Sequence, residues 1–206
     1  MYFYDKHSNA FYVEGVNDIP SGAISITQEY HQQLLNGQAD GKQIVADKNG
    51  YPVLINPAPT SYHELKDGKW VISAPNQAAL LAEKRDQLIA SIDDKATAIY
   101  SLWTRFESEY KARKDAAEQF KNSGYKGEPS VYITSFAIPA GLDNKSATDI
   151  ILQQAAGLQK LQDHLAALRM RKYNLKHPGL TIEQMQSTHD EIVNEMNGLV
   201  EAYNNG

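Results

Sequence analysis

Apolar and polar residues follow two different periods along this chain of 206 residues. Over residues 1 to about 75, short aromatic or β-branched runs alternate with clusters of turn-forming residues, which is typical of β-hairpins. From about Pro75 onward, apolar residues recur at steps of three and four, the spacing of long helices that pack lengthwise on each other. The pattern predicts an α+β protein, with a small hairpin-rich domain at 1–75 and a helical coiled-coil or bundle domain at 76–206.

Three hairpins are expected in the first domain. Two of them turn at Asn49-Gly50 and Asp67-Gly68, because these residues tolerate the positive φ that tight turns require. The strand pairs are Tyr2–Tyr4 with Phe11–Glu14, Gln43–Asp47 with the segment after Gly50, and the two halves of residues 62–73. Each piece is too short to fold alone, so we expect all of them to share one small core.

One short helix is expected between the first two hairpins. Thr27 can cap its first N–H groups, and Gly37 can adopt the left-handed conformation that ends a helix. The strand after this region carries Pro52 near its start, and Pro has no N–H to give to a sheet. We therefore expect the second hairpin to keep one open side.

Three apolar stripes predict the long helices of the second domain. The first runs without Pro or Gly from Ile89 to Phe120, the second begins after Ser146, and the third follows the capping-box pair Thr181 and Gln184. The residues proposed to pack along these stripes are Ile92, Ile99, Trp103, Phe106, Tyr110, Leu158, Leu161 and Leu165. This spacing serves packing within one chain and between chains equally well, so a closed bundle and a homo-oligomer through the helices both stay open.

Composition excludes several classes of function. A net charge of −5 and a pI near 5.7 disfavour a surface that neutralises phosphates, so no nucleic-acid partner is expected. The absence of Cys removes disulfides, thiol catalysis and thiolate metal sites. No apolar run approaches the roughly 18 residues of a membrane helix and no signal-peptide pattern is found, so no membrane partner is expected.

The sequence contains only incomplete versions of metal-binding and catalytic motifs. Residues 36–47 echo the spacing of a calcium loop, but the run begins with Asn36 and no helix follows it, so a polar connection is favoured. The six His residues form no H-x-x-x-H pair, and His189 and Asp190, as helix neighbours, are expected to point about 100° apart. The basic cluster at 169–177 fits the negative pole of a helix end. We predict no enzyme, no metal and no cofactor.

Aromatic residues of the first domain are candidates for a protein-binding surface. Strand alternation puts Tyr2 and Tyr4 on one face, and it also puts Tyr51, Val53 and Ile55 on one face. Aromatic side chains on an open-edged sheet are typical of a partner-binding patch, and burial of all of them in the core is the alternative. The proposed partner-binding residues are Tyr2, Tyr4, Tyr12, Tyr51, Val53 and Ile55.

Four quoted stretches carry a resemblance to a known family. They are MYFYDKHSNAFYVEG, the pattern IT-x-E-x-H-x-x-LL-x-GQ-x-x-GK-x-I, the pattern GYPVL-x-x-P-x-P, and the helix start NQAALLAEKRDQLIASI. Together they resemble the tail-fibre assembly proteins of tailed bacteriophages and phage-derived bacteriocins, over residues 1–95. Residues 116–155 resemble helical C-terminal regions of some phage proteins, whereas the PDIEWP-like tail of many family members does not occur here.

The resemblance implies a non-enzymatic chaperone that binds the C-terminal end of a trimeric phage tail fibre and promotes its folding and trimerisation. It also implies a location in the host cytoplasm during phage assembly. The alternative is a structural virion component at the fibre tip that contributes to host-surface recognition. A glycan-cleaving enzyme is a third reading, but the sequence lacks a well-placed carboxylate pair. We expect residues 1–75 to bind the client and the helices to set spacing or self-association.

Overall fold

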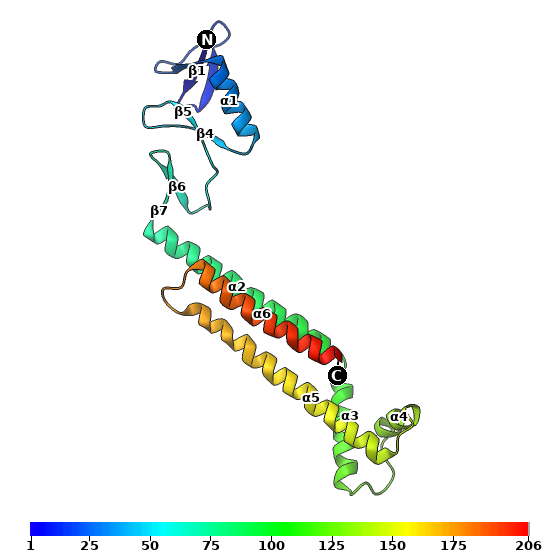
Figure 1. Ribbon diagram of the computed structural model, residues 1–206. Helices are drawn as coiled ribbons and strands as arrows, with labels where there is room; N and C mark the ends of the chain where they lie inside the picture. Colours follow the sequence, from blue (N-terminus) through cyan, green and yellow to red (C-terminus); the bar gives the residue numbers. More distant parts are fainter. Residues whose placement is uncertain (206) are drawn as a thin grey trace. The chain divides into compact units, whose positions relative to one another are not determined.

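The computed structural model describes residues 1–205 and has the predicted α+β class, with short strands and one short helix before a series of longer helices (Figure 1). The chain divides into two compact units, residues 1–80 and residues 81 onward. The division falls inside α2 (Ala74–Trp103), a few residues beyond the expected boundary.

The first unit begins with a three-stranded antiparallel sheet in the order β2-β1-β3. Its strands are β1 (Tyr2–Asp5), β2 (Ala10–Val13) and β3 (Ile24–Ile26). The β1–β2 hairpin confirms the sequence prediction. Strand β3 was not predicted, because a strand of three residues is too short to show a period of two.

Helix α1 (Gln28–Ala39) starts as predicted, since the Thr27 hydroxyl accepts a hydrogen bond from the Tyr30 N–H at 3.1 Å. Its predicted end at Gly37 was wrong. The helix continues to Ala39, and the left-handed residue is Gly41, with φ +87°. Gly37 has a different role: a Cβ at this position would lie 2.3 Å from Leu54 Cδ1, so the glycine lets β5 pack closely against the helix.

Four further strands form two separate hairpins. They are β4 (Gln43–Ala46) with β5 (Pro52–Ile55), and β6 (His63–Lys66) with β7 (Lys69–Ile72). Both confirm the turns predicted at Asn49-Gly50 and Asp67-Gly68. Pro52 starts its strand, as its missing N–H requires.

The core of the first unit is small. Its buried members are Tyr4, Ile26, Leu34 and Ile44, with partly buried side chains from the three-stranded sheet, α1 and the β4–β5 hairpin around them. The β6–β7 hairpin contributes no residue to this cluster. The expectation that all hairpins share one core was therefore wrong, because β6–β7 is held by its own pairing and by side-chain contacts with loops.

The second unit is helical. After α2 it contains α3 (Glu107–Asn122), α4 (Val131–Ala140), α5 (Asn144–Met170), the 3-10 helix η1 (Arg171–Lys176) and α6 (Ile182–Asn205). The Thr181 N–H donates to Gln184 Oε1 at 2.9 Å and the Gln184 N–H donates to Thr181 Oγ1 at 3.2 Å, which confirms the predicted capping box. Helix α5 is capped by Asp143, which accepts from the Ser146 N–H at 2.7 Å, so the expected start at Ser146 was wrong.

The first apolar stripe does not form one continuous helix. The chain leaves the helical path between α2 and α3, and Phe106 has φ −125° and ψ 36°. Three hydroxyls before the break, on Thr97, Ser101 and Thr104, each donate at 2.9 Å to the carbonyl four residues earlier, a type of contact that destabilises and bends helices. As a result Phe106 is 50% exposed, so its predicted place in the packed stripe was wrong.

The main core of the helical unit lies along α2, α5, η1 and α6. Of the residues predicted to pack there, Ile92, Ile99, Trp103 and Leu165 are buried, and Leu158 and Leu161 are partly buried against them. Tyr110 is half-buried outside this cluster. A second, smaller cluster joins α3, α4 and the start of α5, and its buried members are Ala117, Ile133, Ala137, Ala147 and Ile151. Among the described residues, no helix is both long and apolar enough to span a bilayer.

Candidate partner-binding surface

The register of the first sheet sorts its aromatic side chains onto two faces. In the β1–β2 pair, Tyr4 lies opposite Phe11, and Phe3 lies opposite Tyr12. Because side chains alternate along a strand, Tyr4 and Phe11 share one face and Phe3 and Tyr12 share the other. The core of the unit lies on the Tyr4 face, where α1 packs.

The α1 side of the sheet is closed. Tyr4 has 0% exposure, its hydroxyl donates to Asn9 Oδ1, and burial raises the pKa of the phenol. The Tyr2 ring stacks on His31 with centroids 4.3 Å apart, and Phe11 meets the same imidazole edge-on at 4.6 Å. The assignment of Tyr4 to a partner surface was therefore wrong, because its ring is part of the core. Tyr2 is only half-exposed, beside His31.

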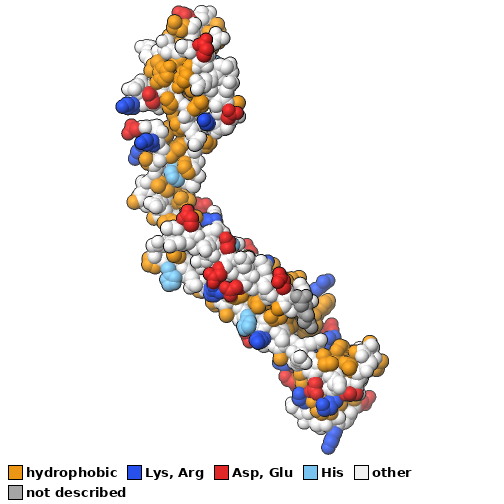
Figure 2. All heavy atoms as spheres, in the orientation of Figure 1, with side chains coloured by type: hydrophobic (Ala, Val, Ile, Leu, Met, Phe, Trp, Pro, Cys, Tyr) orange, Lys and Arg blue, Asp and Glu red, His pale blue; other side chains and the backbone are white. Residues whose placement is uncertain are grey.

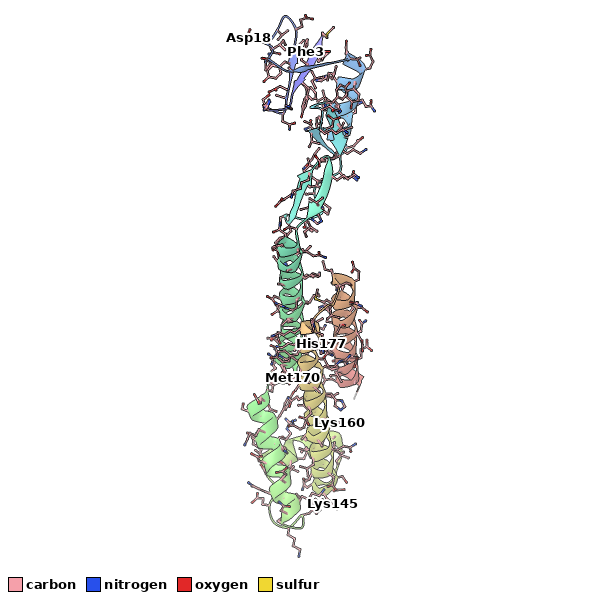
Figure 3. The ribbon with its side chains drawn as sticks, turned by 90° about the vertical axis from the view of Figure 1, so that its left-hand side faces the viewer. Phe3, Asp18, Lys145, Lys160, Met170 and His177 are labelled. Atoms are coloured by element: carbon pink, nitrogen blue, oxygen red, sulfur yellow. The ribbon has the colours of Figure 1, made fainter. Side chains whose placement is uncertain are left out.

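The opposite face of the sheet is open. Phe3, labelled in Figure 3, and Tyr12 are half-exposed there, and the register partner of Phe3 on β3 is the exposed Ser25. The Tyr12 hydroxyl lies 3.1 Å from Ser8 Oγ, so its polar end remains near the surface. Tyr12 was proposed from the sequence, whereas Phe3 was not. The hairpin register would have identified it, because Phe3 is the residue opposite Tyr12.

The β4–β5 hairpin also has a face that points away from the core. Ile44 and Leu54 pair in register on the core side, whereas Val45 and Val53 pair on the other side, with Ile55 beside them. These three outer residues are half-buried. Val53 and Ile55 were proposed from the sequence and Val45 was missed. We define the outer patches as Phe3, Tyr12, Val45, Val53 and Ile55.

Tyr51 and the β6–β7 hairpin add further apolar surface. Tyr51 is 36% exposed and stacks on Tyr30 of α1 with ring centroids 5.4 Å apart. On β6–β7, Leu65 pairs with Trp70, whose indole N–H donates to the Asn56 carbonyl at 2.8 Å. Figure 2 shows hydrophobic side chains gathered on the displayed face of the first unit.

The strand edges of the first unit are partly closed. The Val13 N–H donates to Asn17 Oδ1 at 2.9 Å, and the Val13 carbonyl accepts from the N–H groups of Val16 and Asn17. Pro52 offers no N–H, and its carbonyl accepts the Tyr30 hydroxyl at 2.8 Å. Both contacts use backbone groups that could otherwise form hydrogen bonds with an added strand. The apolar faces of the sheets are therefore more accessible to another protein than the strand edges.

The turn residues have their own structural roles. The Asp5 carboxylate accepts the Ser8 hydroxyl at 2.7 Å and the Ser8 N–H at 2.9 Å, and these bonds lower the pKa of Asp5. Asp47, which echoed the end of a calcium loop, accepts the N–H groups of Asn49 and Tyr51 at 2.8 Å and closes the hairpin. Within residues 1–205, no three His, Cys, Asp or Glu side chains are placed to hold a metal ion.

One arrangement in the helical unit resembles a catalytic triad. His189 Nε2 lies 3.0 Å from Ser91 Oγ, and His189 Nδ1 lies 2.8 Å from Asp190 Oδ1. The expectation that His189 and Asp190 do not converge was therefore wrong. Ser91 lies in the interior of α2, where backbone N–H groups bond within the helix and none is free to stabilise an oxyanion. These contacts tie α2 to α6.

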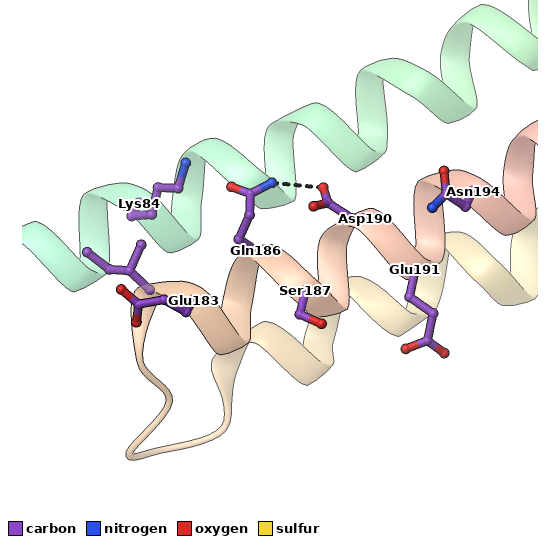
Figure 4. Close-up of a pocket in the computed structure, with 8 residues that line it drawn as sticks. Lys84, Glu183, Gln186, Ser187, Asp190, Glu191 and Asn194 are labelled. Atoms are coloured by element: carbon purple, nitrogen blue, oxygen red, sulfur yellow. Dashed lines mark hydrogen bonds between the residues drawn. The ribbon is translucent and has the colours of Figure 1, made fainter.

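The hollow beside this arrangement is open and polar. It has a volume of about 660 Å³ and is lined by Lys84 on α2 and by side chains of α6 that include Gln186, Asp190 and Glu191 (Figure 4). The Gln186 amide donates to Asp190 at 2.8 Å, so this carboxylate already has two partners. A wide surface hollow of this kind would leave a bound molecule largely exposed to solvent.

The basic cluster at 169–177 is used inside the helical unit. Arg169 and Lys172 both pair with Asp93 of α2 at 2.6 Å, and the hydrogen bond from Lys172 is the main cause of the lowered pKa of Asp93. Arg171 pairs at 2.6 Å with Glu191 and Glu195 of α6. These cations therefore hold helices together.

The chain is similar to two phage proteins. It is 40% identical over 201 residues to the "Uncharacterized 23.3 kDa protein in lys 3'region" of Haemophilus phage HP1, and the match covers 98% of each chain. It is 30% identical over 114 residues to the "Probable tail fiber assembly protein" of Shigella phage SfV, which covers 51% of this chain and 66% of that one. No protein-family model and no solved structure matches the chain. This chain therefore belongs to the same phage protein family as the HP1 protein, along almost its whole length.

Proposed function

We propose that this chain is a non-enzymatic assembly chaperone for a phage tail fibre. The observation that carries the proposal is the partial similarity to a protein named as a probable tail-fibre assembly protein. The apolar outer patches of the first unit support it, because they supply a surface for another polypeptide. The client in this proposal is the C-terminal end of a trimeric fibre, and the outcome is its folding and trimerisation.

The physical need for such a chaperone follows from the topology of fibres. Interlaced β-structure forms through non-local pairings, which are slow, and its unpaired strand edges are prone to wrong association. A surface that holds one end of three chains would lower the entropy cost of bringing them into register.

The outer patches suit this task because they are apolar faces of the sheets and not strand edges with unpaired backbone groups. Phe3, Tyr12, Val53 and their neighbours offer half-exposed side chains that can cover apolar client residues. The closed backbone groups at Val13 and Pro52 limit pairing of the chaperone with its own copies. Binding through faces also permits release, since no continuous ladder of backbone hydrogen bonds forms.

Co-expression tests the proposal. The tail-fibre gene of the same phage genome would be expressed with and without this chain, and the soluble trimeric fibre would be measured by gel filtration and by resistance to SDS. We expect soluble trimer only when both chains are present. Equal yields of soluble trimer in both cases would contradict the proposal.

A matched pair of variants locates the surface. Tyr12→Lys places a charge on the open face of the first sheet, whereas Tyr173→Lys changes an aromatic residue of η1 that is 52% exposed. We expect the first variant to reduce the trimer yield and the second to leave it unchanged, at unchanged melting temperatures. The protein content of purified mature particles then distinguishes the two alternatives. A released chaperone is absent from the particles, whereas a fibre-tip component is present in fixed ratio to the fibre.

A further inference from the structure

A groove of the helical unit lies between its two hydrophobic clusters. It has a volume of about 770 Å³ and is formed by the first turns of α3, the middle of α5 and the end of α6. Leu158 and Leu161 of the main cluster and Ile151 of the smaller cluster line it, together with Tyr110 and Tyr203. The groove thus exposes apolar side chains that a further apolar group could cover.

Phe106 is an exposed aromatic residue close to this groove. It lies at the break between α2 and α3, where α3 leaves the line of α2 (Figure 1), and its side chain is 50% exposed. The centroid of its ring is 6.3 Å from that of Tyr110, which lines the groove. An exposed ring and a groove with room for it therefore lie about one helical turn apart.

The apolar stripe of the sequence runs in phase through the break. Ile99, Trp103, Phe106 and Tyr110 follow each other at alternating steps of four and three, which is the spacing of one face of a continuous helix. On such a helix Phe106 would share a face with Trp103, which is buried in the main core, and with Tyr110. The pattern therefore directs the Phe106 side chain towards the groove if the helix is unbroken.

The break itself is held by few contacts. Within residues 1–205, the backbone N–H groups of Arg105 and Phe106 have no hydrogen-bond acceptor, and α3 begins without a side-chain cap. Residues 76–123 contain neither Gly nor Pro, so the sequence does not forbid a continuous helix here. The contacts that favour the bend are the bonds of the Thr97, Ser101 and Thr104 hydroxyls to carbonyls of their own helix.

Helix α5 has a weak point at the same level. The Tyr100 hydroxyl donates to the Gln162 carbonyl at 3.2 Å, which puts Gln162 beside the last turn of α2. Gly157 precedes it by more than one turn on the antiparallel α5, beside the break, and lines the groove. Glycine weakens a helix interior, so α5 can bend there when α3 changes direction. The smaller cluster takes only α5 residues before Gly157, so it can move as one body.

We propose that α2 and α3 alternate between the bent form of the structure and one continuous helix, in which the Phe106 side chain fills the groove. The continuous form gains hydrogen bonds from the N–H groups of Arg105 and Phe106 to the carbonyls of Ser101 and Leu102, four residues earlier. The bent form leaves the groove open, and the continuous form closes it with a side chain of the same chain. This device belongs to the helical unit and does not depend on the client-binding role of the first unit.

Distances between pairs of spin labels on the full chain test the two forms, because the chain has no native cysteine. Labels at Ala98→Cys and Gln119→Cys occupy exposed positions on either side of the break. The control pair, Gln77→Cys with Ala98→Cys, has the same separation in sequence but lies entirely within α2. We expect one distance of about 31 Å for the control pair, at about 1.5 Å per residue. The test pair should give two distances, a shorter one from the bent form and one of control length.

Side-chain changes should shift the balance in opposite directions. Ser101→Ala with Thr104→Ala removes two hydroxyls that favour the bend, so the distance of control length should gain population. Phe106→Ala removes the ring that fills the groove, so the same distance should lose population. Thr188→Ala is the matched control, because its hydroxyl donates at 3.1 Å to the Gln184 carbonyl within α6, and it should change nothing. A single short distance in the wild type and the hydroxyl variant alike, or equal populations in all variants, would overturn the proposal.

Disulfide formation tests whether Phe106 enters the groove. Gln154 lines the groove from α5 at an exposed position, so a chain with Phe106→Cys and Gln154→Cys can form the bond when the helix is continuous. Arg105→Cys with Gln154→Cys is the control, because neighbouring residues of a helix point about 100° apart. We expect the first pair to oxidise faster, as followed by mass spectrometry of linked peptides. Equal rates in the two chains would refute the filling of the groove by Phe106.

Discussion

The first unit and the helical unit differ in the size of their hydrophobic cores. In the described chain, the largest helical cluster contains ten buried hydrophobic residues, whereas the cluster of the first unit contains four. A small domain with a small core leaves much apolar surface at least partly exposed. The helical unit is therefore held by the larger core, although both units leave some large apolar side chains exposed, such as Tyr51 in the first unit and Leu102 in the second.

The polar contacts of the two units differ in the same way. Helices far apart in sequence are joined by ion pairs, such as those of Asp93 with Arg169 and Lys172. In the first unit the carboxylates of Asp5 and Asp47 accept hydrogen bonds from backbone N–H groups of the turns that follow them. Some charged groups of the helical unit therefore join different helices, whereas Asp5 and Asp47 stabilise local turns.

Trp103→Ala should have the largest effect on stability. The indole is fully buried in the main helical core, so its loss should cost about 3–5 kcal/mol of unfolding free energy. Leu102→Ala is the control, because Leu102 is 58% exposed and its loss should cost less than about 0.5 kcal/mol. Urea unfolding followed by circular dichroism measures both. Equal losses of unfolding free energy in the two variants would mean that the apolar stripe of α2 is not part of a packed core.

Leu34→Ala should have the next largest effect, on the first unit. Leu34 is 1% exposed and is one of four buried members of its core, so we expect a loss of about 2–5 kcal/mol. Amide hydrogen exchange of peptides from residues 2–55 measures it. Gln33→Ala, at an exposed position of the same helix, is the control. Unchanged protection in Leu34→Ala would show that α1 does not hold the two sheets.

Mild acid should weaken the first unit through His31. Burial against Tyr2 and Phe11 lowers the pKa of His31 below its usual 6.5. Below pH 6.5 the unfolded chain takes up a proton that the folded unit resists, so stability falls as the pH drops through the lowered pKa. His31→Gln should reduce this dependence. Hydrogen exchange between pH 7.5 and 5 measures it, and an equal slope in the variant would assign the effect elsewhere.

Strong acid should weaken the helical unit slightly through Asp149. Hydrogen bonds from Lys121 at 3.0 Å and Tyr125 at 2.8 Å lower the pKa of Asp149 from 3.8 to about 2. This contribution is complete above the unfolded pKa of 3.8 and is lost as the pH falls through about 2. The effect should be the smallest of the four, because the pair is exposed to solvent.

The measurement is thermal unfolding of wild type and Asp149→Asn between pH 5 and 2. The two stabilities should converge as the pH falls. A difference that stays constant over this range would show that the ionised carboxylate contributes nothing through these hydrogen bonds.

Turns and caps were readable from the sequence because their chemistry is local. Asn49-Gly50 and Asp67-Gly68 marked two hairpins, and Thr181 with Gln184 marked the start of α6. The three-and-four spacing identified Ile92, Ile99, Trp103 and Leu165 as packed residues of the long helices for the same reason, since one helix face repeats along a short stretch of chain.

Features set by tertiary context were not readable. The alternation of side chains along β1 puts Tyr4 and Phe3 on opposite faces, but it does not show which face α1 covers. Tyr4 was therefore predicted to be exposed although it is buried. Helix α4 has no charged residue and is only ten residues long, so its sequence shows no clear apolar stripe. The break after Trp103 has no Gly or Pro, and it coincides with hydroxyl groups that bond back to the helix at Thr97, Ser101 and Thr104.

Hydrogen exchange of the chain alone and in complex with the tail fibre of the same phage genome tests the central claim most directly. If the outer patches hold the client, amides of residues 2–13 and 43–55 should gain protection in the complex, while those of α6 should not change. Gained protection confined to the helices, with none in residues 2–55, would contradict the account.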